Sequence, residues 1–293
     1  MNALLAGDAL DLPARLAALA GWDGRPFDLV YVDPPFNVGR AFALRRTDGD
    51  ARAFDDAWTG LDTFLAMLTP RVAAMRAAMS ERGCLFLHLD HRAVHDAKVS
   101  LDRVFGRTAF RGEIVWTPGN GARGRGVPTT HQTILVYSKS AKPSGEYVWN
   151  DDDPALREPF AKTSLAMHFG NVDADGRHYR ERVISGKTYR YYADRGRKLG
   201  SVWSDLPAMA ANTPLRRETS GYPTQKPLAL LERIVRAASL PGDLVVDPMC
   251  GSGTTLEAAA RLGRRFVGND VGAPALSIAR ARLARAGIDA LDG

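Results

Sequence analysis

Short apolar runs bounded by turn-forming residues alternate along the chain with longer amphipathic segments. The runs predict β-strands and the longer segments predict helices. Strands are expected near residues 3–6, 28–33, 84–89, 112–116, 132–138, 243–247 and 265–269. Helices are expected near residues 13–20, 61–80, 91–104, 226–239, 254–262 and 273–286. This alternation predicts a doubly wound α/β fold, in which a mainly parallel seven-stranded sheet is covered by helices on both faces.

Three stretches interrupt the alternation. Residues 37–60 and 119–130 are expected to be loops, long enough to serve the function. Residues 141–205 are rich in Pro, Gly, Asp and Tyr with short β-like runs, and predict a small inserted domain. The remaining parts, 1–140 and 206–293, are then two portions of one larger domain.

Composition indicates a soluble globular protein. With 293 residues, of which 45% are hydrophobic, the chain can bury a sizeable core. No apolar run approaches membrane-spanning length, and no basic start leads into an apolar stretch, so no membrane partner is expected. Cys84 and Cys250 lie in unrelated, apolar contexts, which predicts no disulfide and a cytoplasmic location.

The expected strand at 28–33 runs into the turn Asp33-Pro34-Pro35-Phe36. This turn places a carboxylate, backbone carbonyls and an aromatic ring at a strand end. Two acceptors can hold an amino group while the ring stacks on the heterocycle that carries it, so the turn suits a planar base. The simpler interpretation is structural, because Pro-Pro also ends strands and Asp before Pro commonly begins turns.

A second expected strand ends in the loop Asp247-Pro-Met-Cys-Gly251-Ser252-Gly253-Thr254-Thr255, and a helix follows. Glycines there let the backbone approach a ligand, and the helix start presents free N–H groups. Asp270 lies 23 residues beyond Asp247, an offset that suits an acid accepting from ribose hydroxyls. An NAD site is the alternative, but Leu256 stands where its third glycine belongs. A carboxylate at Asp247 favours a cationic ligand such as S-adenosylmethionine.

These motifs resemble the amino-methylating DNA methyltransferases (adenine-N6 and cytosine-N4), in the circular arrangement called the beta group. In that group the catalytic motif comes first, the target-recognition region follows and the cofactor loop comes last, as here. The resemblance covers nearly the whole chain outside residues 141–200. Its motifs are Leu5–Leu10, Asp33–Phe36, Gly83–Asp90, Glu113–Trp116, His131–Lys139, Val202–Asp205, Gly221–Pro227 and Asp247–Thr255.

The resemblance implies the seven-stranded methyltransferase variant of the doubly wound fold, S-adenosylmethionine as cofactor and double-stranded DNA as partner. It implies a catalytic role for Asp33, Pro34, Pro35 and Phe36. The implied cofactor residues are Asp8, Lys226, Asp247, Gly251, Ser252, Gly253, Thr254 and Asp270. Among these, Asp8 matches the acid near the adenine ring, although a turn or capping role explains it equally well. Lys226 resembles the segment that closes the methionine end of the pocket.

The chemistry of an exocyclic amine explains why such a site needs two acceptors. The amine is a poor nucleophile because its lone pair is delocalised into the ring. Hydrogen bonds to the Asp33 carboxylate and the Pro34 carbonyl draw the nitrogen towards sp3 and free the lone pair. The base must be flipped out of the duplex, and Phe36 is its expected stacking partner. Asp-Pro-Pro with Tyr or Phe mostly accompanies adenine N6 in this family, so adenine is favoured and cytosine N4 is the alternative.

A basic segment at residues 177–198 holds eight Lys and Arg against two acids, which equals the +6 net charge of the chain. Four tyrosines are interleaved, and the segment falls where the family carries its target-recognition region. The expected DNA contacts there are Arg177, Arg180, Arg190, Arg195 and Arg197. A solvated hairpin face is the alternative. Arg123 and Arg125, in a glycine-rich loop, are expected to follow the phosphate backbone.

Two tempting features are set aside. His88, Asp90, His91 and His95 suggest a metal site, but a helix start with Asp90 as its cap is favoured, so no metal is expected. Cys250 suggests the nucleophile of a cytosine-C5 methyltransferase, which would make the Asp-Pro-Pro-Phe turn redundant.

Other readings of the chain stay open. RNA and protein-glutamine methyltransferases use similar turns, but usually begin them with Asn and place the cofactor loop first. A DNA-binding protein with a decayed cofactor pocket and an NAD-dependent oxidoreductase are weaker alternatives. The resemblance leaves room for a homodimer and for a restriction enzyme that acts on the same DNA site.

Overall fold

The computed structural model describes residues 2–35, 40–44, 51–56, 59–119, 126–142, 146–209 and 218–292, without the side chains of 40–44, 51–56 and 292. The chain divides into two compact units. The first, here called the sheet unit, comprises residues 1–149 and 201–293, and the second, the inserted unit, comprises residues 150–200.

A nine-stranded sheet forms the centre of the sheet unit in the part of the chain that the structure describes, in the order β13-β6-β7-β5-β2-β14-β15-β1-β16. Its seven longer strands are β1 (Ala3–Ala6), β2 (Phe27–Val32), β5 (Met79–Leu89), β6 (Phe110–Trp116), β7 (Gln132–Ser138), β14 (Leu244–Asp247) and β15 (Arg265–Asp270). Two-residue strands, β13 (Val202–Trp203) and β16 (Leu291–Asp292), close the two edges. All seven expected strands are therefore confirmed.

The sheet is mainly parallel. Strand β2 lies between β5 and β14 and is parallel to both, and β14, β15 and β1 continue in the same direction. Strand β7 is antiparallel to its neighbours β5 and β6. Strands buried on both faces must be apolar at nearly every position, as β2 and β14 are, which is why they read as continuous apolar runs in the sequence.

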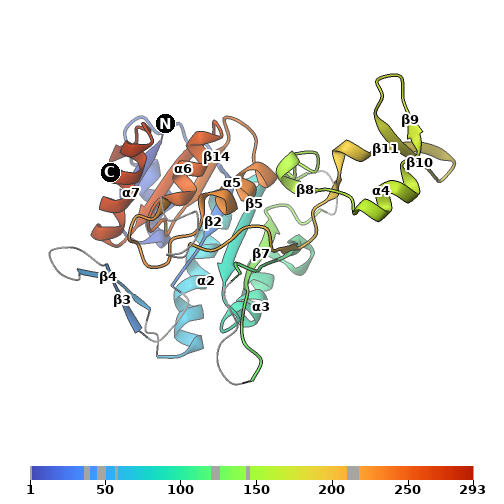
Figure 1. The fold of residues 1–293 in the computed structure, drawn as a ribbon. Coiled ribbons are helices and arrows are strands. Elements are labelled where there is room, and N and C mark those ends of the chain that lie inside the picture. The colour runs from blue at the N-terminus through green and yellow to red at the C-terminus, as the bar shows by residue number, and fades with distance from the viewer. Residues whose placement is uncertain are drawn as a thin grey trace. The chain divides into compact units, whose positions relative to one another are not determined.

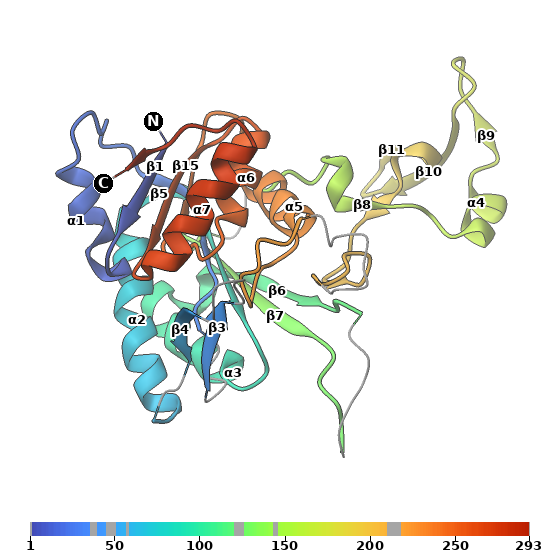
Figure 2. The ribbon, with the colours of Figure 1, turned by 60° about the vertical axis from the view of Figure 1, so that its left-hand side comes forward.

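Helices cover both faces of the sheet (Figures 1 and 2). The helices of the first face are α1 (Leu12–Ala17), α2 (Leu61–Ala78) and α3 (Val94–Phe105). Those of the second face are α5 (Leu228–Ala238), α6 (Thr254–Arg261) and α7 (Ala273–Arg285). Alternate strand residues serve the two layers: Val30 and Val32 join the core beneath the first three helices, and Leu29 and Tyr31 are buried on the other face.

The prediction of a loop over residues 37–60 is wrong for two segments, which form strands. Strands β3 (Arg40–Leu44) and β4 (Ala51–Asp56) pair antiparallel as a separate two-stranded sheet. Both segments contain apolar residues, and Asp48-Gly49 between them is a common hairpin-turn sequence, so a signal for the pairing was present. Of the expected loop at 119–130, residues 120–125 lie outside the described residues.

The inserted unit is narrower than the expected insert of 141–205. At one boundary, residues 201–205 belong to the sheet unit, because β13 pairs with β6. At the other boundary, residues 141–149 also belong to it, where the Val148 N–H donates to Arg82 O at 3.1 Å. The unit contains β8 (Arg157–Glu158), α4 (Lys162–His168), β9 (Asn171–Val172), β10 (His178–Ile184), β11 (Lys187–Tyr192) and β12 (Arg197–Lys198). Strands β9, β10 and β11 form an antiparallel sheet, and β8 pairs with β12. Phe160 and Phe169, whose rings lie 4.6 Å apart, supply part of its small core.

Candidate active site

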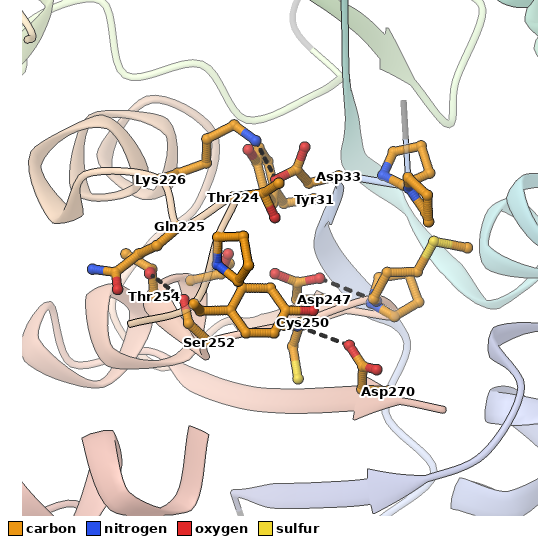
Figure 3. Close-up of a pocket in the computed structure, with 18 of the residues that line it drawn as sticks. Tyr31, Asp33, Thr224, Gln225, Lys226, Asp247, Cys250, Ser252, Thr254 and Asp270 are labelled. Carbon is orange, nitrogen blue, oxygen red and sulfur yellow. Dashed lines mark hydrogen bonds and ion pairs between the residues drawn. The ribbon is translucent and has the colours of Figure 1, made fainter. Parts of the chain in front are cut away.

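Three carboxylates meet at the carboxyl edge of the parallel sheet. Asp33 directly follows β2, Asp247 ends β14 and Asp270 ends β15, and these three strands are neighbours. The chain leaves β2 towards β5 and leaves β14 towards β15, so this is the point where the strand order reverses, a common ligand-binding position in such sheets. A cavity of about 710 Å³ opens here and is lined by all three acids (Figure 3).

The structure brings most of the sequence-predicted residues to this one cavity. Those that line it are Asp8, Asp33, Pro34, Pro35, Lys226, Asp247, Gly251, Ser252, Thr254 and Asp270. Gly253 does not line the cavity, although it belongs to the same loop. Phe36, Arg123 and Arg125 lie outside the described residues. The two motifs, separated by more than two hundred residues in sequence, therefore share one site.

The turn after β2 carries a partly buried ion pair. Lys226, which precedes α5, donates from Nζ to Asp33 Oδ2, and the two side chains point towards each other in Figure 3. The Lys226 side chain is 8% exposed and that of Asp33 is 17% exposed. Burial raises the pKa of Asp33 above its usual range, while the charge of Lys226 opposes that rise. Lys226 thus contacts the turn that begins at Asp33, a contact that the sequence did not reveal.

A neutral polar pair lies beside this turn and was also missed from the sequence. The Tyr31 hydroxyl and His88 Nδ1 are 2.8 Å apart, and both residues are buried. The His88 ring meets Trp116 edge-on, with centroids 5.7 Å apart. Burial, and then Lys226, hold the pKa of His88 well below its usual range, so the imidazole is uncharged at neutral pH. Tyr31, Trp116 and Gln132 line the cavity, which gives its wall apolar faces and polar edges.

Asp247 is a buried carboxyl at the base of the cavity. Burial raises its pKa to about 7, against hydrogen bonds from the Thr255 side chain and the Met249 N–H, and the charges of Asp33 and Asp270 raise it further. A cation entering the cavity would favour the ionised form. Cys250, by contrast, is a thiol held protonated, because burial, Asp270 and Asp247 raise its pKa well above the usual range. This opposes a role as a nucleophile.

Glycines are required in the loop between β14 and α6. Gly251 has φ of +48°, and a Cβ there would lie 3.0 Å from the Tyr222 ring. Gly253 has φ of +74°, and a Cβ there would lie 2.9 Å from the Cβ of Ala279 on α7. Gly253 therefore shapes the loop through close packing rather than by lining the cavity. The hydroxyls of Ser252 and Thr254 lie 3.2 Å apart, and both residues line the cavity.

Asp8 caps a short helix and also lies at the cavity wall. Its Oδ1 accepts from the Leu10 N–H at 2.8 Å, which caps a short 3-10 helix at Ala9–Asp11, and its Oδ2 pairs with Arg71 from α2. It also lines the cavity. A capping role and a place beside a ligand are therefore compatible at this position.

Most arginines expected to contact DNA have partners within the inserted unit. Arg177 makes a two-point ion pair with Asp194 at 2.8 and 2.9 Å. Arg190 pairs with Glu181 at 3.1 Å, and Arg197 with Glu158 at 3.1 Å. Arg180 lies over the rings of Phe160 and Phe169, at 5.3 and 5.0 Å. Arg195 is exposed.

The metal interpretation finds no geometry to support it. Over the described ranges, no cluster of three or more His, Cys, Asp or Glu residues is arranged to hold an ion. His88 bonds to Tyr31, and the Asp90 carboxylate accepts from the Arg92 N–H at 3.0 Å, just before α3. Among the helices described here, none has the length and apolarity needed to cross a membrane.

Comparison with known families identifies the family of this chain. A family model of N6/N4 type, described as a DNA methylase, matches residues 27–280. The chain belongs to this family of DNA methylases, which confirms the resemblance seen in the sequence.

Individual relatives are distant. The chain is 27% identical over 293 residues to the Type II methyltransferase M.EcaI of Enterobacter cloacae, covering 85% of this chain and 62% of that protein. It thus spans less than two thirds of the length of M.EcaI. It is also 27% identical over 282 residues to the DNA adenine methyltransferase YhdJ of Escherichia coli K12, covering 96% of this chain and 82% of YhdJ.

Solved structures share the fold. The M1.HpyAVI–SAM complex matches with a TM-score of 0.56 at 20% identity, covering 97% of this chain and 99% of that one. The cytosine-N4-specific PvuII DNA methyltransferase matches with a TM-score of 0.59 at 16% identity, covering 96% of this chain and 86% of that one. The expected α/β methyltransferase fold is therefore confirmed.

Proposed function

We propose that this protein transfers a methyl group from S-adenosylmethionine to the exocyclic amine of a base flipped out of double-stranded DNA, with adenine N6 favoured. The observation that carries this proposal is the shared cavity. The acceptor turn at Asp33 and the glycine loop after Asp247 line one space, as methyl transfer between two ligands requires. Membership of the N6/N4 DNA methylase family supports the same reaction.

The acceptor half of the site is the turn of Asp33 and Pro34. Among the described residues, Asp33 Oδ1 is a buried oxygen without a hydrogen-bond partner. Such an acceptor is satisfied when a ligand amine donates to it. The Pro34 carbonyl is the proposed second acceptor and Phe36 the proposed stacking partner. Holding both amine hydrogens frees the nitrogen lone pair for attack, and no covalent enzyme intermediate is needed.

The cofactor half fits a cationic nucleotide derivative. When bound, S-adenosylmethionine supplies an electrophilic methyl group on a positively charged sulfur. Asp247, buried and with its pKa near 7, is ready to ionise beside a cation. We assign Asp270 to the ribose, Asp8 to the adenine side, and the residues from Gly251 to Thr254 to the cofactor loop. The relative crystallised as a SAM complex supports this choice of cofactor.

The choice of base rests on motif chemistry. The Asp-Pro-Pro-Phe turn and the relative named as an adenine methyltransferase favour adenine N6. Cytosine N4 is the alternative, since both amines need the same acceptors, and one structural neighbour is titled cytosine-N4-specific. RNA or protein amines are the more distant alternative.

The inserted unit is the proposed target-recognition element, and its hairpin offers one face without acids. Residues paired across β10 and β11 point to the same side, so Arg180, Arg182 and Ile184 share a face with Tyr191, Tyr189 and Lys187. Glu181 and Arg190 lie on the other face, paired to each other. We name the exposed set Arg182, Ile184, Lys187 and Tyr189 the open hairpin face, and propose that it contacts DNA alongside Arg195. Arg123 and Arg125 remain proposed phosphate contacts.

We propose two further partners besides DNA. The Type II name of one relative supports a restriction enzyme acting on the same site. The resemblance supports a homodimer, which sedimentation of the purified protein tests directly.

Nucleoside mass spectrometry on unmethylated DNA incubated with the protein and S-adenosylmethionine tests the reaction. We expect N6-methyldeoxyadenosine, and N4-methyldeoxycytidine would assign the alternative base. Asp33→Ala is expected to abolish transfer while cofactor affinity, measured by calorimetry, stays within about twofold, because Asp33 is placed on the acceptor side. Normal turnover in that variant, or no methylated base with DNA of broad sequence content, would refute the proposal.

A further inference from the structure

The Asp33–Lys226 ion pair assigns Lys226 to the acceptor side of the cavity. The two residues are 193 positions apart in sequence, and both side chains have little solvent exposure where they meet. The sequence motif alone associates Lys226 with the cofactor. In the structure its Nζ instead donates to the carboxylate that is proposed to receive the target amine.

This contact makes the two oxygens of Asp33 unequal. Oδ2 is held by the Lys226 ammonium, whereas Oδ1 is buried and, within the described part of the chain, accepts no hydrogen bond. A carboxylate free to rotate could present either oxygen to a ligand. The ion pair fixes which one is left for it, because an ammonium donor holds a carboxylate strongly at low exposure.

The ion pair also sets the charge of the site. Lys226 is the cation next to Asp33, and the other titratable groups nearby are Tyr31 on β2, His88 on β5, Tyr222 ahead of Lys226, and Asp247 on β14. Burial keeps Tyr31, Tyr222 and His88 uncharged at neutral pH. Asp247 adds negative charge as it ionises, and this charge disfavours the ionised form of Asp33 close by. Loss of Lys226 would therefore leave Asp33 buried among neutral groups and one acid.

We propose that Lys226 is a positioning residue, which keeps Asp33 ionised and turns Oδ1 towards the amine of the flipped base. This inference rests on the proposed function. A protonated Asp33 would bring a hydroxyl donor to the place where the amine needs an acceptor, so the ionised form is the productive one. Lys226 acts through Asp33 and takes no part in bonding to the methyl group.

Three substitutions separate charge from hydrogen bonding. Lys226→Met removes both, Lys226→Gln keeps a donor without charge, and Lys226→Arg keeps both. Lys142→Met is the matched control, because it removes the lysine of an exposed ion pair with Glu146 in the same unit. The Asp33 carboxyl is followed by NMR with 13C-labelled aspartate, assigned from the signal that Asp33→Asn removes, and methyl transfer is followed against pH.

We expect Lys226→Met and Lys226→Gln to raise the pKa of Asp33 by at least about one unit. Each unit lowers the ionised fraction about tenfold at pH values below that pKa, so the acidic limb of the rate profile moves to higher pH. Lys226→Arg should restore the profile in part, and Lys142→Met should leave it unchanged. Cofactor affinity should stay within about twofold throughout.

Two results would overturn the proposal. One is an unchanged Asp33 pKa and an unchanged profile in Lys226→Met and Lys226→Gln. The other is weaker cofactor binding with the Asp33 pKa unchanged, which would place Lys226 on the cofactor. The NMR titration needs no activity. The Lys226 variants could therefore shift the Asp33 pKa even if the wild-type protein methylates no DNA. That result would show that Lys226 controls the ionisation of Asp33, and it would overturn the proposed function alone.

Discussion

Gly251 and Asp270 join the ends of two neighbouring strands. The Gly251 N–H donates to Asp270 Oδ2 at 2.9 Å, and the Gly272 N–H donates to Oδ1 at 2.8 Å. The acid proposed to hold the ribose is thus itself held by backbone donors from the loops after β14 and β15. Its position is fixed before any ligand arrives, which reduces the ordering cost of binding.

Asp270→Asn should weaken S-adenosylmethionine binding by at least about tenfold. An amide side chain offers one acceptor and one NH₂ group in place of two acceptors, so one of the two N–H donors loses its partner and the loop shifts. Calorimetry measures the affinity, with Asp62→Asn at an exposed position of α2 as control. Unchanged affinity in Asp270→Asn would contradict the assignment to the ribose.

Gly253→Ala should destabilise the protein more than Gly263→Ala. Both glycines have positive φ, +74° and +72°, so each alanine incurs a similar backbone cost of roughly 1–2 kcal/mol. Only at Gly253 would the new Cβ meet another atom, the Cβ of Ala279 at 2.9 Å. We expect a further loss of roughly 1–3 kcal/mol in the free energy of unfolding there. Urea denaturation of the two variants measures the difference in their free energies of unfolding. Equal losses would show that α7 can move away from the new Cβ at almost no energetic cost.

The strands of the sheet unit were predictable because a strand buried on both faces is apolar at nearly every position. The long helices were predictable because a helix that covers a sheet is apolar on one side only, which gives an amphipathic pattern. The β3–β4 hairpin was missed because its runs are short and mixed with charged residues. The contact between Lys226 and Asp33 could not be read locally, since only the strand order brings the segments together. The family resemblance still implied that Asp33 and Asp247 serve one reaction. The structure brings them together because neighbouring parallel strands end at the same edge of the sheet.

The inserted unit shows a different limit of sequence reasoning. Counting cations located a basic segment, but the count does not say which arginines have acids beside them. The partners of Arg177, Arg190 and Arg197 come from positions 9 to 39 residues away, set by strand register. Register also places Arg182 and Lys187, two of the eight cations counted in that segment, on a face without acids.

Proton release should accompany cofactor binding, because the pKa of Asp247 is about 7 in the ligand-free protein. The pKa of Asp247 in the folded protein lies above its ordinary value of 3.8, so the folded state binds this proton more tightly than the unfolded state does. The resulting contribution to stability is fully present at low pH and is lost as the pH rises towards 7. A bound cation favours the carboxylate. Calorimetry at about pH 6.5 in buffers of different ionisation enthalpy should show release of up to one proton. Asp247→Asn should abolish this release, and a wild-type protein that releases none would contradict the proposed contact.

The open hairpin face should dominate the salt dependence of DNA binding. Arg182→Ala combined with Lys187→Ala removes two cations for which the described residues supply no ion-pair partner. Each phosphate contact contributes about 0.9 to the slope of log affinity against log salt, so the double variant should reduce the magnitude of that slope by about 1.8. Arg177→Ala combined with Arg190→Ala removes the same charge from arginines already paired to Asp194 and Glu181, and should change the slope less. Fluorescence anisotropy on labelled duplex DNA across a salt series measures both. A larger effect from the paired arginines would move the DNA contact to the opposite face, because those ion pairs are exposed and open readily to phosphate.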